Sequence, residues 1–191
     1  MIFCNLKMLL SARNLRISRV ANDTGISRTT LTSLSQNDLK GVQLSTLDTL
    51  CQYLEIDPKQ FFEYHPFNFE YDLDICWDNN NSKTPGIDRF DTTLLFNVYS
   101  KGIKKDVIKY TGDLEITYQD QSDLGGADVQ YHIDFDLSDK KYYERYINKL
   151  STYARTLILI QHIRPLLDET IRNKYNKKKP FSLGGMMNIT L

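Results

Sequence analysis

The fold of this chain is decided between Val20 and Leu34, where the sequence reads VANDTGISRTTLTSL. We predict a helix that ends at Gly25, because glycine adopts the positive φ of a helix C-terminus without a Cβ clash. A second helix begins after Ser27, whose hydroxyl can accept a hydrogen bond from a backbone N–H one turn later. The apolar side chains that hold these two helices together are those of Val20, Ala21, Ile26, Leu31 and Leu34.

The second of these helices keeps a polar face that the apolar contacts leave free. This face consists of Arg28, Thr29, Thr32 and Ser33, which lie between the apolar positions. A short helix held at an angle, with small polar side chains and one arginine on its free face, suits the major groove of DNA.

Apolar periodicity predicts three more helices around this pair. The first carries Leu6, Leu9 and Leu10 and ends near Asn14. Ser45 is expected to cap the fourth helix, whose apolar stripe contains Leu47, Leu50, Cys51 and Leu54. Asp57 and Pro58 are typical of a helix start and predict a short fifth helix, which Phe61 and Phe62 would close. Residues 1–64 are therefore predicted to form a five-helix bundle.

These residues resemble the lambda-repressor/Cro-type (XRE-like) helix-turn-helix domain over residues 5–64, about a third of the chain. The matching marks are Ala21, Gly25, Ile26, Ser27, Leu31, Leu34, the segment 44–47, the segment 54–58, Phe61 and Phe62. The resemblance implies a sequence-specific, DNA-binding transcriptional regulator. It places the base-reading positions on Arg28, Thr29, Thr32 and Ser33. It places the phosphate contacts on Arg16, Ser18, Thr30, Asn37 and Lys40.

One position departs from the family pattern. Family members often place a glutamine at the start of helix two to bind a phosphate, and this chain has Ile17 there. Arg16 and Ser18 are the nearest replacements. Arg28 is the residue we expect to contact guanine O6 and N7, and Thr29 can contact a thymine methyl group. Because one such domain contacts only a half-site, we expect a homodimer on a palindromic operator in double-stranded DNA. We expect a repressor, since the sequence shows no obvious surface for contacting a polymerase.

After Tyr64 the pattern changes from helical to alternating. His65 and Pro66 mark the boundary, because the residue before a proline is disfavoured in a helix. Apolar and polar residues then alternate over residues 67–77, 89–100, 113–119 and 129–137. This period of two predicts four strands, and their short connections favour an antiparallel meander with one covered face.

The expected cover is a long helix that begins after Ser138 or Asp139. Its apolar stripe contains Tyr143, Tyr146, Ile147, Leu150, Tyr153, Ala154, Leu157, Ile158 and Ile160. Pro165 should end or kink it near Ile163. The predicted fold class is therefore α+β, with a helix-turn-helix bundle over residues 1–64 and a sheet plus long helix over residues 67–175. Residues 176–191 are predicted to be a basic, flexible tail. The second domain is expected to dimerise the protein, to sense a ligand or partner, or to act as an effector.

Composition supports a globular chain, and charge is unevenly distributed along it. The 191 residues are 41% hydrophobic and carry no net charge. Residues 66–137 have six Lys or Arg against fourteen Asp or Glu, near −8, while residues 138–191 have eleven against four, near +7. Three widely spaced cysteines argue against a disulfide framework. No stretch approaches the roughly 20 apolar residues of a membrane span. We expect a cytoplasmic protein without membrane contact.

The sequence shows no catalytic set, and we expect neither an enzyme nor a cofactor. It contains no glycine-rich phosphate loop and no nucleophile elbow. His132, Asp134 and Asp136 share one face of a strand, but a solvated sheet face explains them better than a metal site does, so no metal is predicted.

The acidic residues of the predicted sheet allow three interpretations. Those at alternating positions are Glu70, Asp72, Asp74, Glu115, Asp134 and Asp136. They can be solvated, can face the basic helix within or between subunits, or can bind a nucleic-acid-binding protein in place of DNA. Two alternative functions follow. One is a mobile-element protein, similar to anti-CRISPR proteins, whose acidic domain inhibits a nucleic-acid-binding enzyme. Its helix-turn-helix domain would regulate the protein's own promoter. The other is an interaction module that does not bind DNA.

Overall fold

The computed structural model describes residues 1–38, 41–121, 126–138, 140–175 and 181–189. The fold is α+β, with helices in the N-terminal part and a strand-rich sheet after them. The chain divides into two compact units, Met1–Pro66 (unit 1) and Phe67–Leu191 (unit 2).

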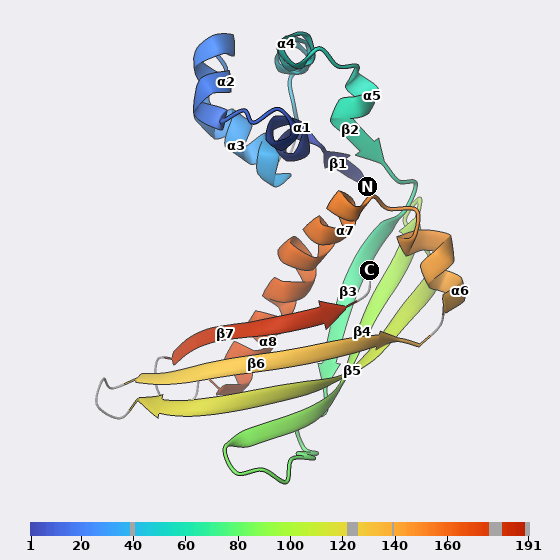
Figure 1. Cartoon of the computed structure of the whole chain (residues 1–191). Helices are drawn as coiled ribbons and strands as arrows, with labels where there is room; N and C mark the ends of the chain where they lie inside the picture. Colours follow the sequence, from blue (N-terminus) through green and yellow to red (C-terminus); the bar gives the residue numbers. More distant parts are fainter. Residues whose placement is uncertain (39–40, 122–125, 139, 176–180, 190–191) are drawn as a thin grey trace. The chain divides into compact units, whose positions relative to one another are not determined.

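Unit 1 is mainly helical (Figure 1). Its helices are α1 (Leu6–Ala12), α2 (Ile17–Thr24), α3 (Arg28–Gln36), α4 (Leu44–Leu54) and α5 (Pro58–Phe61). It also contains two short strands that the sequence did not predict, β1 (Ile2–Cys4) and β2 (Phe62–Tyr64), which pair antiparallel.

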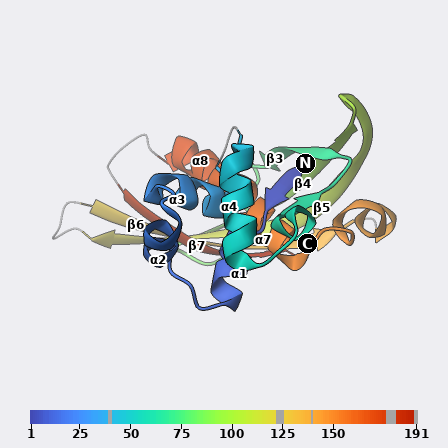
Figure 2. The same cartoon turned by 90° about the horizontal axis from the view of Figure 1, so that it is seen from above.

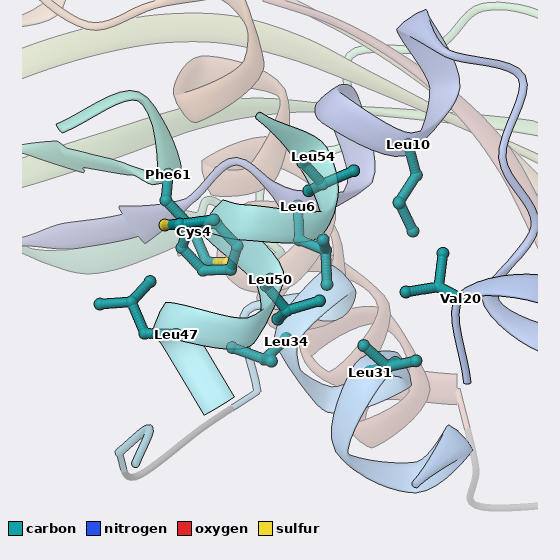
Figure 3. Packing of buried hydrophobic residues seen from close by; sticks show 11 residues of the cluster. Cys4, Leu6, Leu10, Val20, Leu31, Leu34, Leu47, Leu50, Leu54 and Phe61 are labelled. Carbon is teal, nitrogen blue, oxygen red and sulfur yellow. The ribbon is translucent and has the colours of Figure 1, made fainter. Parts of the chain in front are cut away.

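One apolar cluster holds the helices of unit 1 together (Figure 3). Its buried members are Cys4, Leu6, Leu10, Val20, Leu31, Leu34, Leu47, Leu50, Cys51, Leu54 and Phe61. Ala21 and Ile26 pack against this cluster while remaining partly exposed. Since α1, α2, α3 and α4 all contribute to it, the cluster fixes the angles between the helices.

Two helices of unit 1, α3 and α5, begin with a side-chain cap, whereas α1, α2 and α4 begin without one. Asp57 caps α5 with Pro58 at the first helical position, as predicted. The start predicted at Ser45 is wrong, because α4 begins at Leu44 and its cap is Gln43. Glutamine is not one of the preferred capping residues and the Gln43 side chain makes no capping hydrogen bond, so no local signal marks this position as a cap.

Unit 2 contains a five-stranded sheet in the order β3-β4-β5-β6-β7, whose strands are labelled in Figure 2. Its strands are β3 (Asn68–Ile75), β4 (Ile87–Ser100), β5 (Ile103–Gln121), β6 (Gly126–Leu137) and β7 (Phe181–Ile189). The antiparallel meander predicted for the first four strands is confirmed. The flexible tail predicted over residues 176–191 is not seen at residues 181–189, which pair parallel with β6 as β7. Residues 176–180, 190 and 191 lie outside the described residues.

The helical segment of unit 2 is interrupted where one long helix was expected. It consists of α6 (Lys140–Tyr142), the π-helix η1 (Tyr143–Ile147), α7 (Thr152–Ile158), the π-helix η2 (Leu159–Ile163) and α8 (Arg164–Tyr175). Ser151 starts α7 by accepting a hydrogen bond from the backbone of Ala154 at 3.0 Å. Pro165 lies inside α8 and does not end the helix. The π-helical turn before it lets the backbone accommodate the proline ring.

The helices of unit 2 pack on one face of its sheet, which we call the inner face (Figure 1). The Tyr131 hydroxyl donates a hydrogen bond to Asp168 of α8 at 2.7 Å, and the ring of Tyr71 stacks on His162 with centroids 5.2 Å apart. The acidic side chains point to the other, outer face, where Glu70, Asp72, Asp74, Asp91, Asp113, Asp134 and Asp136 are exposed. Within unit 2, the basic helical segment therefore does not cover the acidic face.

Candidate nucleic-acid interface

The turn between α2 and α3 has the geometry predicted from its sequence. Gly25 ends α2 with φ 75° and ψ 0°, and its backbone N–H donates to the Ala21 carbonyl at 3.0 Å. Ser27 caps α3, and its hydroxyl oxygen accepts a hydrogen bond from the Thr30 backbone N–H at 3.1 Å. These two local interactions set where α3 begins and how it leaves α2.

The buried and exposed sides of α3 separate cleanly. Leu31 and Leu34 are 0% exposed and face the core of unit 1. Arg28 and Thr29 are exposed, and Thr32 and Ser33 are partly exposed. Because successive helical residues are about 100° apart, these four positions share the side opposite the core. The structure thus brings together the four residues predicted to contact bases, and Gln36 extends the same side by one turn.

The predicted phosphate contacts occupy three different environments. Arg16 caps α2 and Ser18 lies in its first turn, and both side chains are exposed. The Thr30 hydroxyl lies 2.9 Å from the Ser27 hydroxyl, within the cap of α3. Lys40 lies outside the described residues.

Asn37 has a role that the sequence did not predict. Its side chain is only partly exposed, and its amide binds the backbone of Cys4 in β1. An amide held in this way contributes to the internal structure of unit 1 and has less capacity left for a phosphate.

A shallow pocket adds further polar groups next to α3. Its volume is about 350 Å³, and its lining includes Thr29, Thr30, Ser33, Gln43 and Thr46. Gln43 and Thr46 belong to the first turn of α4, where backbone N–H groups lack helical partners. Sequence reasoning missed Gln43 because it placed the cap of this helix two residues too late, at Ser45, and no local pattern marks Thr46 as part of a site.

The charged side chains at the starts of α2 and α3 suit an anionic ligand. Within the described chain, Arg16 and Arg28 form no ion pair with a carboxylate. Arg19 does pair with Asp23, at 3.5 Å. The Tyr53 hydroxyl of α4 donates to the same carboxylate at 2.7 Å, which raises the pKa of Tyr53 and ties α4 to α2. The guanidinium groups of Arg16 and Arg28 can therefore bind phosphate or base oxygens without first breaking an internal ion pair.

Other classes of site find little support in the part of the chain that the structure describes. No group of three His, Cys, Asp or Glu side chains there could hold a metal ion. His132 instead contacts Asp134, with 2.9 Å between Nε2 and Oδ2. No helix among these residues is both long and apolar enough to cross a membrane.

Comparisons with known proteins agree with this geometry. Residues 5–66 match the family model of the Cro/C1-type HTH DNA-binding domain. A protein of Bacillus subtilis (strain 168), described as "Uncharacterized HTH-type transcriptional regulator YozG", is 30% identical over 63 residues, which are 33% of this chain and 75% of that protein. No solved structure matches the chain. The chain belongs to the Cro/C1-type helix-turn-helix family, and unit 1 is its DNA-binding domain.

Proposed function

We propose that this protein is a sequence-specific transcriptional repressor that binds a palindromic operator as a homodimer and performs no catalysis. The observation that carries the proposal is the exposed side of α3, where Arg28, Thr29, Thr32 and Ser33 lie together opposite a fully buried apolar side. A dimer bound across a promoter excludes a polymerase sterically, so repression needs no further contact surface.

The roles of the individual side chains follow from their positions. α3 is the recognition helix and enters the major groove, with Arg28 donating two hydrogen bonds to guanine O6 and N7. Thr29 contacts a thymine methyl group, while Thr32 and Ser33 contact neighbouring base edges. Arg16 and Ser18 at the start of α2, and Gln43 and Thr46 at the start of α4, bind phosphates on either side.

Selection from a random DNA library by the full-length chain, followed by footprinting, tests this function. We expect one palindromic sequence to be enriched and protected. Arg28→Ala should weaken binding by about 1–3 kcal/mol and relax specificity at one base pair. Arg172→Ala is the matched control, because it also removes one exposed arginine but lies in unit 2. Failure of the wild-type chain to enrich any sequence would contradict the proposed function.

The outer face of the sheet favours a second candidate function. The strand register places Asp91, Asp113 and Asp134 directly opposite one another on three neighbouring strands. This row of carboxylates resembles the charge of a nucleic-acid backbone, and unit 2 would then inhibit an enzyme that binds nucleic acid. Titration of the full chain into an RNA-guided DNA cleavage reaction tests this function. Inhibition should disappear when all three aspartates are changed to asparagine, and no inhibition by the wild type would exclude this enzyme class.

A further inference from the structure

Asn37 ends the recognition helix and binds a strand that is distant from it in the sequence. Its backbone adopts φ 58° and ψ 25° at the C-terminal cap of α3. The side-chain Nδ2 donates a hydrogen bond to the Cys4 carbonyl at 2.9 Å, and Oδ1 accepts one from the Cys4 backbone N–H. Both polar groups of one backbone residue are therefore bound by a single side chain. We call this pair of hydrogen bonds the Asn37–Cys4 clasp.

The pairing of β1 explains why these backbone groups of Cys4 are available. The His65 N–H donates to the Met1 carbonyl at 2.8 Å, and the Asn5 N–H donates to the Phe61 carbonyl at 2.9 Å. In an antiparallel pair, alternate residues direct their backbone groups toward the partner strand. Met1 and Asn5, at odd positions, direct these groups toward β2. Cys4, at an even position, therefore directs its N–H and carbonyl to the open edge of β1. The Asn37 amide occupies that edge in place of a third strand.

Packing adds to the hydrogen bonds at the same place. The Cys4 side chain is only 5% exposed and belongs to the same apolar cluster as Leu34 of α3 (Figure 3). The C-terminal end of α3 is thus attached to β1 by a buried side chain and by the clasp. Its N-terminal end is held separately, by the Gly25 turn and the Ser27 cap.

We infer that Asn37 is a positioning residue for DNA recognition: the clasp fixes the C-terminal end of α3 on β1 and so sets how its exposed side meets the base pairs. This inference rests on the proposed DNA-binding function. Base contacts need their side chains placed within about 0.5 Å, which requires supporting hydrogen bonds behind them. Without the clasp, only the packing of Leu34 holds the C-terminal end of this nine-residue helix, and a tilt at that end moves Ser33 and Gln36 more than it moves Arg28.

Positioning differs from a phosphate contact in what it does to specificity. A lost phosphate contact weakens binding to every DNA sequence by a similar factor. A general loss of stability lowers the active fraction and also affects all sequences alike. A misplaced recognition helix instead weakens binding to the operator and leaves non-specific binding unchanged. The ratio of the two affinities therefore reports on positioning.

The variant that isolates the clasp is Asn37→Gly. Glycine keeps the positive φ at the helix end at no steric cost, so only the side-chain amide is lost. The matched control is Asn14→Gly, because Asn14 also has a positive φ, 54°, but its side chain is exposed. The probes are the duplex that the wild-type chain enriches from a random library and a scrambled duplex of the same length and composition.

Fluorescence anisotropy with full-length protein should show that Asn37→Gly lowers the ratio of operator to scrambled affinity about tenfold, roughly the effect of one or two hydrogen bonds. Asn14→Gly should leave the ratio unchanged. Amide hydrogen exchange provides a readout without DNA: Asn37→Gly should speed exchange of the Cys4 N–H, while the Asn5 N–H, which is bound to Phe61, stays protected.

The possible outcomes separate the inference from the function on which it rests. An unchanged ratio in Asn37→Gly, or an equal loss on both duplexes, overturns the positioning role while DNA binding stands. Unchanged exchange at Cys4 also overturns it, because the clasp would then be absent in solution. A wild-type chain that enriches no DNA sequence overturns the proposed function and the positioning role together.

Discussion

Gly25 is needed for its backbone conformation, since its surroundings leave room for a side chain. Its φ is 75°, and a Cβ added there would meet nothing within 4 Å. Gly112 in β5 shows the opposite case, because a Cβ there would clash with the backbone oxygen of Asp134. The two glycines therefore fulfil different requirements: one permits a turn and the other permits two strands to approach.

We predict that Gly25→Ala destabilises unit 1 by about 1–2 kcal/mol, because an L-residue is strained at this φ. Gly41→Ala is the control, since an added Cβ there also meets nothing and the backbone is not in the strained region. Thermal unfolding followed by circular dichroism should show a lower midpoint for the first variant and an unchanged or higher one for the second. Equal midpoints in both variants would contradict the role assigned to the turn.

Burial controls the chemistry of Cys4. It raises the pKa of the Cys4 thiol from 9.0 to about 11, while Cys76 is exposed. At pH 8 only about one Cys4 thiol in a thousand is ionised, and thiolates are the reactive form. We predict that iodoacetamide modifies Cys76 in the folded protein and reaches Cys4 only in denaturant, as mass spectrometry of the digested chain can show.

The same pKa predicts how stability depends on pH. Between pH 9 and 11 the unfolded chain ionises Cys4 while the folded chain keeps it protonated, so the free energy of unfolding should fall as the pH rises through this window. Cys4→Ala should remove that part of the slope. An equal slope in the variant would show that other groups cause the alkaline loss of stability.

At the residue scale, the sequence predicts those features that depend only on the spacing of neighbouring residues. That Arg28, Thr29, Thr32 and Ser33 share one side of α3 was predictable, because helical periodicity alone separates the two sides of this helix. The role of Asn37 depends on Cys4, which lies 33 positions away, and no local pattern reveals such a contact. Gln43 was missed for a different reason, since it precedes α4 as its cap residue without making a side-chain capping hydrogen bond.

At the element scale, periodicity works where one side of an element is buried along its whole length. It located α1, α4 and the buried sides of β3, β4 and β6, whereas α2, α3 and α5 were predicted mainly from the residues that end or start them, Gly25, Ser27, Asp57 and Pro58. It failed at the start of β5, because Ile103 and Val107 of this strand are exposed and Lys104 and Lys105 interrupt the alternation. It also failed at β1 and β2, which have three residues each and are too short to show a period.

The hairpin between β4 and β5 shows how a turn can go unrecognised. Lys101 and Gly102 both have positive φ, at 53° and 76°, and Ser100 pairs directly with Ile103. This geometry is that of a two-residue turn of type I′, which normally favours asparagine or aspartate before the glycine. Lysine at the first position concealed the turn, and the third strand was therefore expected ten residues too late.

At the element scale, like charges lie directly opposite one another on the outer face of the sheet, and the effect of their repulsion on stability can be measured. Asp113 of β5 lies directly opposite Asp91 on one side and Asp134 on the other, and like charges at such positions repel. We predict that Asp113→Asn stabilises unit 2 by about 0.2–1 kcal/mol, with a larger gain at low salt. Urea unfolding followed by the fluorescence of Trp77, which packs on Phe90 in unit 2, measures this gain.

The control for this prediction is Asp136→Asn. Asp136 lies on the same face and strand as Asp134, but its direct neighbour on β5 is Thr111. Its replacement removes one charge without removing a directly opposed pair, so the gain should be smaller. An equal gain in both variants would mean that total charge, and not the cross-strand row, limits the stability of the sheet.

At the scale of the whole molecule, the net charge of unit 1 does little to favour DNA binding. Unit 1 contains seven Lys or Arg against six Asp or Glu, so it has little excess positive charge with which to release counterions from DNA. In general, one copy of a helix-turn-helix domain contacts only one half-site. Because one copy of unit 1 is only modestly attracted to DNA and contacts only half of an operator, tight binding to DNA needs a second copy of the chain.

We therefore predict that the full chain is a dimer at the concentrations at which it protects its operator. Sedimentation equilibrium should give about twice the 22.3 kDa chain mass. The half-sites should be centred about 34 Å apart, one helical turn of DNA, because symmetric recognition helices must enter successive major grooves on one side of the duplex. Inserting about five base pairs between the half-sites turns one of them to the opposite side of the duplex and should abolish the gain in affinity from the second copy of unit 1. Inserting about ten base pairs should restore part of this gain. A monomer at protecting concentrations, or an affinity that does not change with the insertion, would contradict the dimer and leave DNA binding by the single domain intact.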